Sequence, residues 1–143
     1  GNEFIHDTYG LSPEAHKADV EGLPSPEEQA KAFGLPMKAK SIPVGKYLVN
    51  GEIIKFGKSE LAVLSFPVIR PVAFYNKKNG FVIVGDSLFA GSIGRTDLWG
   101  GNQDVLLAAI KDKLLSLPDE TVVYPGHGPE TRIIDEKLNN PYL

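Results

Sequence analysis

Two residues that are able to bind a metal ion each follow a short apolar run in this chain. Asp86 comes after the run Phe81–Val84 and one glycine, and His127 follows Thr121–Tyr124 in the turn Pro125-Gly126-His127-Gly128-Pro129. Runs this short and rich in β-branched residues indicate strands, and Phe81–Val84 is predicted to be buried on both faces. A carboxylate beside a buried strand is costly unless something pairs with it, and ligands gather at strand ends in open α/β sheets. The pattern therefore predicts two strands that each deliver one metal-capable residue.

Hydrophobic periodicity and turn signals predict an α/β domain over residues 1–143, with strands in the middle and helices at both ends. Ser25 and Glu28 form the pattern of a capping box, and Asn50-Gly51 is typical of a hairpin turn. The predicted helices are a short one that Asn2 caps and that runs through Tyr9 to end at Gly10, a turn at Lys17–Gly22, a helix from Pro26 to Phe33, Gln103–Leu117 and about Pro129–Leu138. The other predicted strands are Ser12–His16, Tyr47–Val49, Glu52–Phe56 (paired with Tyr47–Val49), Glu60–Phe66 and Val72–Asn76, the last paired with Phe81–Gly85.

Composition excludes several classes of protein. A net charge of −3 and the lack of a basic cluster argue against nucleic acid or an anionic membrane as partner. The absence of cysteine excludes disulfides, thiol nucleophiles and cysteine-ligated zinc, and it fits a reducing compartment, so we expect a cytoplasmic protein. No apolar run approaches the roughly 20 residues of a membrane span, and the N-terminus lacks the features of a signal peptide.

Three motifs resemble the metallo-β-lactamase fold, in its glyoxalase II-like branch. Phe81–Phe89 resembles the family's GD-x-LF motif, Gly94-Arg95-Thr96-Asp97 its GR-[TS]-D loop, and Tyr124–Pro129 its PGHGP motif. Asn140-Pro141 matches the usual ending of that branch. The resemblance covers residues 47–143 most strongly and implies an αββα sandwich that holds one or two metals, usually zinc and sometimes iron. In that family, water activated by the metals attacks a thioester, a lactam or a related bond.

The resemblance implies that Asp86 matches the aspartate that bridges two metals and that His127 matches the last histidine ligand. The family's first ligand motif, T-H-x-H-x-D-H, is absent and would lie before Gly1. The stretch Leu64–Tyr75, which matches a second ligand loop, contains no histidine, and Phe66, Val68 and Ile69 make it apolar. Two of the seven usual ligands thus have matches, whereas zinc sites use three or four protein ligands. His6 and His16 could in principle be recruited.

The missing ligands predict a metal-site-deficient, non-catalytic derivative of a glyoxalase II-like hydrolase, engineered or evolutionarily reduced, with no catalytic residue and no cofactor. Its fold is predicted to be α/β, a reduced part of the αββα sandwich with a mixed sheet flanked by helices. The missing strands would leave one sheet face and one sheet edge open, which predicts self-association. The expected partner is a second copy of the chain, in a homodimer. The alternative is a residual zinc- or iron-dependent hydrolase of thioesters such as acylglutathione. It would use Asp86 and His127 with further ligands from elsewhere or from a second subunit.

Each candidate residue also has a purely structural interpretation. Asp86 could act as a cap or ion-pair partner, and His127 could be held in its tight turn by backbone groups. Arg95 and Asp97 could touch substrate, although an ion pair that fixes their loop is the preferred interpretation. Ser87 has no histidine nearby in sequence to activate it as a nucleophile.

Overall fold

The computed structural model describes residues 1–20, 24–35, 40–66, 72–96 and 102–143. The chain divides into two compact units, residues 1–48 and 49–143. The expectation of a single domain over residues 1–143 stays a prediction. Among the described residues, no helix has both the length and the apolar character needed to cross a lipid bilayer.

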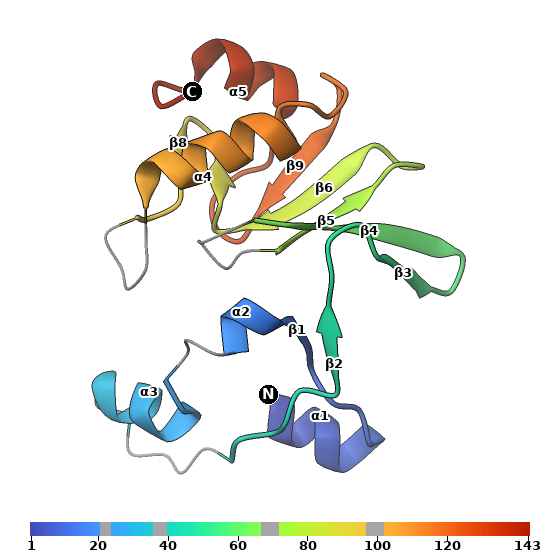
Figure 1. The fold of residues 1–143 in the computed structure, drawn as a ribbon, viewed down its shortest axis with the longest axis vertical. Coiled ribbons are helices and arrows are strands. Elements are labelled where there is room, and N and C mark those ends of the chain that lie inside the picture. Colours follow the sequence, from blue (N-terminus) through green and yellow to red (C-terminus); the bar gives the residue numbers. More distant parts are fainter. Residues whose placement is uncertain (21–23, 36–39, 67–71, 97–101) are drawn as a thin grey trace. The chain divides into compact units, whose positions relative to one another are not determined.

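The described residues of the N-terminal unit form three short helices and one pair of strands; Figure 1 shows their arrangement along the chain. Its elements are α1 (Asn2–Tyr9), β1 (Glu14–His16), α2 (Lys17–Val20), α3 (Pro26–Ala32) and β2 (Lys46–Leu48). Strands β1 and β2 are parallel, and Glu14 lies opposite Lys46. The carbonyl group of Pro13 accepts a hydrogen bond of 3.0 Å from the backbone N–H of Gly45, which continues this pairing beyond the strands.

The predicted helix signals of this unit are confirmed in part. Helix α3 has the full capping box, with Ser25 and Glu28 each accepting a backbone hydrogen bond from the other residue. Helix α1 ends at Gly10, whose φ of 66° is easily adopted only by glycine. The prediction that Asn2 caps α1 was wrong. The carbonyl group of Gly1 already accepts from Ile5, so the helix starts one residue earlier than predicted and Gly1 is the cap.

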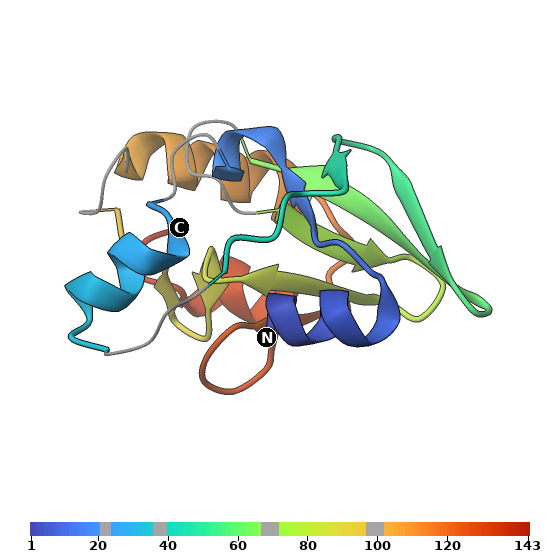
Figure 2. The same ribbon diagram turned by 90° about the horizontal axis from the view of Figure 1, so that it is seen from below.

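The C-terminal unit is built on one mixed, six-stranded sheet. In spatial order its strands are β10 (Thr131–Arg132), β9 (Val122–Pro125), β6 (Phe81–Gly85), β5 (Val72–Asn76), β4 (Ser59–Ser65) and β3 (Ile53–Phe56). All neighbours are antiparallel except β6 and β9, which are parallel. The β3–β4 hairpin, green in Figure 2, projects beyond the rest of the sheet. A small hairpin of β7 (Leu88–Phe89) and β8 (Ser92–Ile93) follows β6.

The predicted hairpin around Asn50-Gly51 was wrong. Strand β2 pairs with β1, and β3 pairs with β4 instead. The backbone N–H of Gly51 donates to Val63, and the side chain of Asn50 accepts from the backbone N–H of Ser65. Because these bonds tie Asn50-Gly51 to β4, the turn does not fold the preceding strand back onto β3.

The helices of this unit, α4 (Gln103–Ala109), the π-helical turn η1 (Ile110–Leu114) and α5 (Ile133–Asn139), contribute to one core (Figure 1). Buried side chains of the helices meet those of β5, β6 and β9 there, namely Ala73, Val82, Val84, Val123, Leu106, Ala109, Ile110, Leu114 and Ile133. The predicted helix over Gln103–Leu117 is confirmed as far as Leu114, although its second half is π-helical. The predicted start of the last helix at Pro129 was wrong, because residues 131–132 pair with β9 as a strand.

Strand β6 is buried on one face only, contrary to the prediction. Val82 and Val84 are fully buried, whereas Ile83 is 41% exposed. Alternate residues of a strand point to opposite faces, so the helices cover one face of β6 and leave Ile83 on the other. An apolar side chain at every position was therefore a misleading sign of two covered faces.

Candidate functional site

The structure brings Asp86 and His127 together at one end of the sheet. Asp86 directly follows β6, and His127 lies two residues after β9. These strands are parallel neighbours, with Gly85 opposite Pro125. The Nδ1 atom of His127 lies 2.9 Å from Oδ1 of Asp86, a hydrogen-bonding distance. The predicted delivery of two metal-capable side chains by two strands is thus the observed geometry, and their role as ligands stays a prediction.

Two glycines let the chain approach Asp86 closely. The backbone N–H of Gly126 donates to the carbonyl group of Gly85 at 2.8 Å. A Cβ atom at Gly126 would lie 2.5 Å from Oδ1 of Asp86, and one at Gly94 would overlap the carbonyl oxygen of Asp86. Glycine at positions 94 and 126 therefore makes room for the Asp86 backbone and carboxylate respectively.

Ser87 has a structural role next to the pair. Its side chain is buried, and its hydroxyl group donates to the carbonyl group of Val84 at 2.7 Å. Its own carbonyl group accepts from the backbone N–H of Gly94. These bonds hold the turn after β6 and occupy the hydroxyl proton, which agrees with the sequence-based rejection of Ser87 as a nucleophile.

Residues of the loop that follows are only partly described. Arg95 is exposed, and Asp97 lies outside the described residues. The predicted Arg95–Asp97 pair, and the alternative of contact with a substrate, therefore stay predictions. Pro67–Pro71, which includes Val68 and Ile69 of the predicted apolar loop, also lies outside the described residues, whereas Phe66 just before it is buried in the core.

Glu136 is a site-supporting residue that the sequence did not reveal. It is 3% exposed, and its carboxylate accepts hydrogen bonds from the hydroxyl of Thr131, the backbone N–H of Gly91 and the side chain of Asn140. Asn140 also donates to the carbonyl group of Ser92. The network ties the β7–β8 hairpin, which begins two residues after Asp86, to helix α5. The sequence placed Glu136 within the predicted helix from about Pro129 to Leu138, and a glutamate within a helix is most often on its exposed face.

The Asp86–His127 pair is open to solvent. The side chain of His127 is 79% exposed and that of Asp86 is 64% exposed. A polar contact this exposed contributes little to stability, because water competes with it. Accessibility combined with a weak structural contribution is what a ligand-binding position requires.

The donor chemistry of the pair suits zinc or iron, which accept imidazole nitrogen and carboxylate oxygen. The number of donors is too small, because the described residues contain no group of three or more His, Asp or Glu side chains able to hold a metal. His6 pairs with its neighbour Asp7 at 3.2 Å, and His16 ends strand β1. The described residues therefore present a partial set of ligands.

Comparison with known proteins identifies the family. The Metallo-beta-lactamase superfamily matches residues 9–127. The chain belongs to this superfamily. Its α/β fold, with a mixed sheet and helices, agrees with that of solved superfamily members. The resemblance to the glyoxalase II-like branch is also confirmed, because the curated relatives include a hydroxyacylglutathione hydrolase.

Two curated relatives cover different shares of the superfamily chain. The probable metallo-hydrolase YqgX of Bacillus subtilis is 47% identical over 68% of this chain and 47% of its own length. The hydroxyacylglutathione hydrolase GloC of Haemophilus influenzae is 37% identical over 92% of this chain and 62% of its own. The chain thus spans about half to three-fifths of these relatives.

Two crystal structures agree with the fold. TTHA1623, solved in a di-iron-bound form, is 37% identical and superposes with a TM-score of 0.84 over 99% of this chain and 70% of its own. BLEG-1, a B3 metallo-beta-lactamase, is 35% identical and gives a TM-score of 0.83 over 98% of this chain and 68% of its own. Both structures therefore match nearly the whole described fold.

Proposed function

We propose that this chain carries part of the metal site of a glyoxalase II-like hydrolase, with Asp86 and His127 as two of the ligands. The observation that carries the proposal is their contact of 2.9 Å at the ends of two neighbouring parallel strands. The reaction of the complete site would be hydrolysis of a thioester such as an acylglutathione, as the name of the relative GloC suggests. A bound metal would lower the pKa of a water molecule and stabilise an oxyanion.

The role of the chain's own residues is to hold the donors ready. The contact between Asp86 and His127 places the imidazole beside the carboxylate before any metal arrives, which lowers the entropic cost of ordering both groups. Gly126 keeps the space next to the carboxylate free. The pair is exposed, so a metal and a substrate can reach it.

The 143-residue chain by itself is proposed to be metal-site-deficient and non-catalytic. The described residues offer two adjacent donors, while zinc sites use at least three protein ligands. Catalysis would require ligands from outside the described residues or from a second subunit. Origin as an engineered or reduced derivative stays a prediction.

Zinc content and thioester hydrolysis, measured on the same purified chain, test this proposal. The chain is exposed to zinc, freed of excess metal and analysed by inductively coupled plasma mass spectrometry. We expect less than one zinc ion per chain, a still lower zinc content in the Asp86→Asn variant, and no hydrolysis of a lactoylglutathione thioester. Stoichiometric zinc together with hydrolysis that Asp86→Asn abolishes would show that the chain is a complete enzyme. Residual zinc that is unchanged in Asp86→Asn and His127→Ala would remove both residues from the ligand set.

We also propose that the chain self-associates through the sheet face that carries Ile83. Ile83 and Tyr124 lie opposite each other in the β6–β9 pairing, and each is 41% exposed. The ring of Tyr124 packs edge-on against that of Phe81, with 5.8 Å between ring centroids. Exposed apolar side chains that adjoin in this way favour association with a second copy.

Light scattering coupled to size-exclusion chromatography tests whether the chain forms a dimer. We expect a dimer for the parent chain and a monomer for Ile83→Glu, since the new charge would be buried in the interface. The matched control is Leu138→Glu, an exposed apolar residue of helix α5 that is 73% exposed. A parent chain that remains monomeric at all concentrations would refute self-association.

A further inference from the structure

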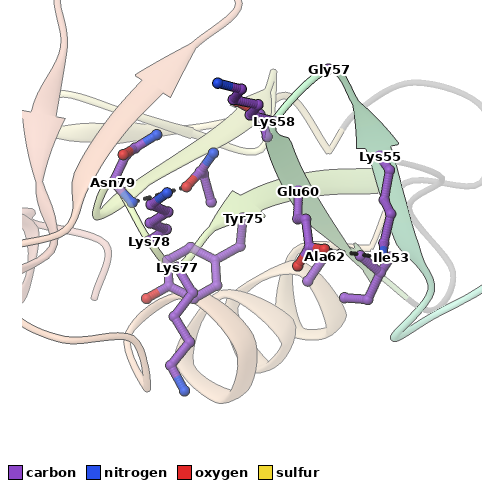
Figure 3. A pocket seen from close by; sticks show the side chains of 12 residues that line it. Ile53, Lys55, Gly57, Lys58, Glu60, Ala62, Tyr75, Lys77, Lys78 and Asn79 are labelled. Carbon is purple, nitrogen blue, oxygen red and sulfur yellow. Dashed lines mark hydrogen bonds and ion pairs between the residues drawn. The ribbon is translucent and has the colours of Figure 1, made fainter.

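A cavity of about 930 Å³ lies in the C-terminal unit, at the end of the sheet where two hairpins turn (Figure 3). It is lined by residues of β3, β4 and β5 and of the turns that follow β3 and β5. Four lysines line it, namely Lys55, Lys58, Lys77 and Lys78. Neither Asp86 nor His127 is among the residues that line this cavity.

The strand topology separates this cavity from Asp86. Strand β6 starts just after the turn at residues 77–80 and ends at Gly85, next to Asp86. Five residues of strand span about 16 Å. The turn after β3 lies at the same end as the turn after β5, because β4 is antiparallel to both β3 and β5. The two turns therefore meet at the end of the sheet opposite to the Asp86–His127 pair.

The lining is positively charged. Besides the four lysines it includes one acidic residue, Glu60, so the formal charge of the lining is 4 − 1 = +3. The whole chain has a formal charge of −3. Lys55 and Glu60 pair at 3.2 Å across β3 and β4, which leaves the lysines of the two turns as the uncompensated charge within the lining. A concentration of like charge in a hollow attracts and retains anions.

The floor of the cavity is apolar. Ile53, Ala62 and Tyr75 lie opposite one another in the register of β3, β4 and β5, so their side chains share one face of the sheet. Ile53 is 49% exposed and Tyr75 is half-buried. An apolar floor beside cationic turns suits a ligand that has an apolar body and an anionic group.

We propose that this pocket binds a small organic phosphate of the nucleoside phosphate class. Lys77, which extends on the same side as Tyr75 in Figure 3, holds the phosphate, and the row Ile53, Ala62 and Tyr75 contacts the apolar body. Phosphate is the fitting anion because lysine binds it as a point charge and needs no bidentate geometry. The volume lies within the range of small-molecule pockets. This site is independent of the function proposed for Asp86 and His127.

Calorimetric titration of the full 143-residue chain with ADP, inorganic phosphate and adenosine tests the proposal. We expect ADP to bind more tightly than phosphate, and adenosine to bind least. The double variant Lys77→Ala/Lys78→Ala should weaken ADP binding about tenfold or more, as expected for the loss of charged hydrogen bonds. Ile53→Ser should weaken ADP binding and leave phosphate binding unchanged.

The control variant Lys31→Ala/Lys111→Ala removes the same net charge from exposed positions outside the lining. It should bind ADP as the parent chain does. Amide chemical shifts should change at Gly57, Lys58 and Asn79 when ADP is added. The proposal is overturned if ADP does not bind, if the control variant loses as much affinity as the pocket variant, or if the shifts move at Gly126 and His127 instead.

Discussion

Two carboxylates of the C-terminal unit differ in burial and in bonding. Glu136 is 3% exposed and accepts from three donors, which come from β10, the β7–β8 turn and the residue that follows helix α5. Asp86 has a side chain that is 64% exposed and contacts His127. A buried carboxylate is tolerated only when its oxygens are satisfied, whereas an exposed one keeps its hydration.

The difference indicates which carboxylate stabilises the fold and which is available for chemistry. The bonds of Glu136 hold in place the hairpin and helix next to the site. Asp86 contributes little to folding and can exchange its water for a ligand. Stability measurements should therefore respond to Glu136, and ligand binding should respond to Asp86.

The largest expected effect is that of Glu136→Ala. The substitution leaves the hydroxyl of Thr131, the amide of Asn140 and the backbone N–H of Gly91 without their acceptor. These bonds are buried or partly buried, and a hydrogen bond to a charged group contributes about 1.5–3 kcal/mol, so we expect the free energy of unfolding to fall by about 2–5 kcal/mol. Urea denaturation measures it. The exposed Glu130→Ala is the control and should change stability by less than about 0.5 kcal/mol. Equal effects of the two variants would contradict the structural role of Glu136.

Substituting the two glycines that border Asp86 tests the roles of its backbone and of its side chain separately. Gly94→Ala places a methyl group onto the carbonyl oxygen of Asp86, whose backbone is held by neighbouring bonds, so we expect a loss of about 1–3 kcal/mol. Gly126→Ala meets Oδ1 at the end of the Asp86 side chain, which can rotate away at smaller cost. Gly126→Ala should therefore unfold at nearly the parent urea concentration yet lose residual zinc. The reverse ranking of stability would show that the side chain of Asp86 is the more rigid part.

Local sequence signals explain what could be predicted in these regions. The strands around Phe81–Gly85, their hairpin and the capping box at Ser25 depend on residues close in sequence, and they are confirmed. The proximity of Asp86 and His127 was also accessible, since two parallel strands end at the same edge of a sheet.

Long-range pairing explains what could not be predicted. The parallel pairing of β1 with β2 joins segments about 30 residues apart and overrides the local hairpin signal of Asn50-Gly51. Glu136 was missed because its donors are as far away as Gly91. The lysine-lined pocket was missed for the same reason, since strand pairing brings Lys55 near Lys77. Each of these features depends on contacts between segments that are far apart in the sequence, and no local pattern encodes it.

Asp86→Asn tests the other side of the comparison. The change keeps the size of the side chain and removes its charge, at a position where solvent screens the contact with His127. We expect the free energy of unfolding to change by less than about 1 kcal/mol, while the residual zinc of the chain falls. Zinc content and urea denaturation on the same preparation measure both. A stability loss as large as that of Glu136→Ala would make Asp86 a structural residue.

The smallest effect concerns Glu28, a carboxylate that is exposed like Asp86 but bonded at a helix end. Its Oε2 atom accepts from the backbone N–H of Ser25 at 2.7 Å, and this bond, followed by the interaction with the Ser25 hydroxyl group, lowers the pKa of Glu28 below its ordinary value of 4.5. A carboxyl group whose pKa is lower in the folded state stabilises the fold above its unfolded pKa, and that contribution disappears as the pH falls through the folded pKa. Helix α3 should therefore fray below about pH 4.5. Amide chemical shifts of Glu28 and Gln29 followed against pH should show this transition, and Glu28→Gln should remove it. A transition that persists in Glu28→Gln would assign the fraying to another group.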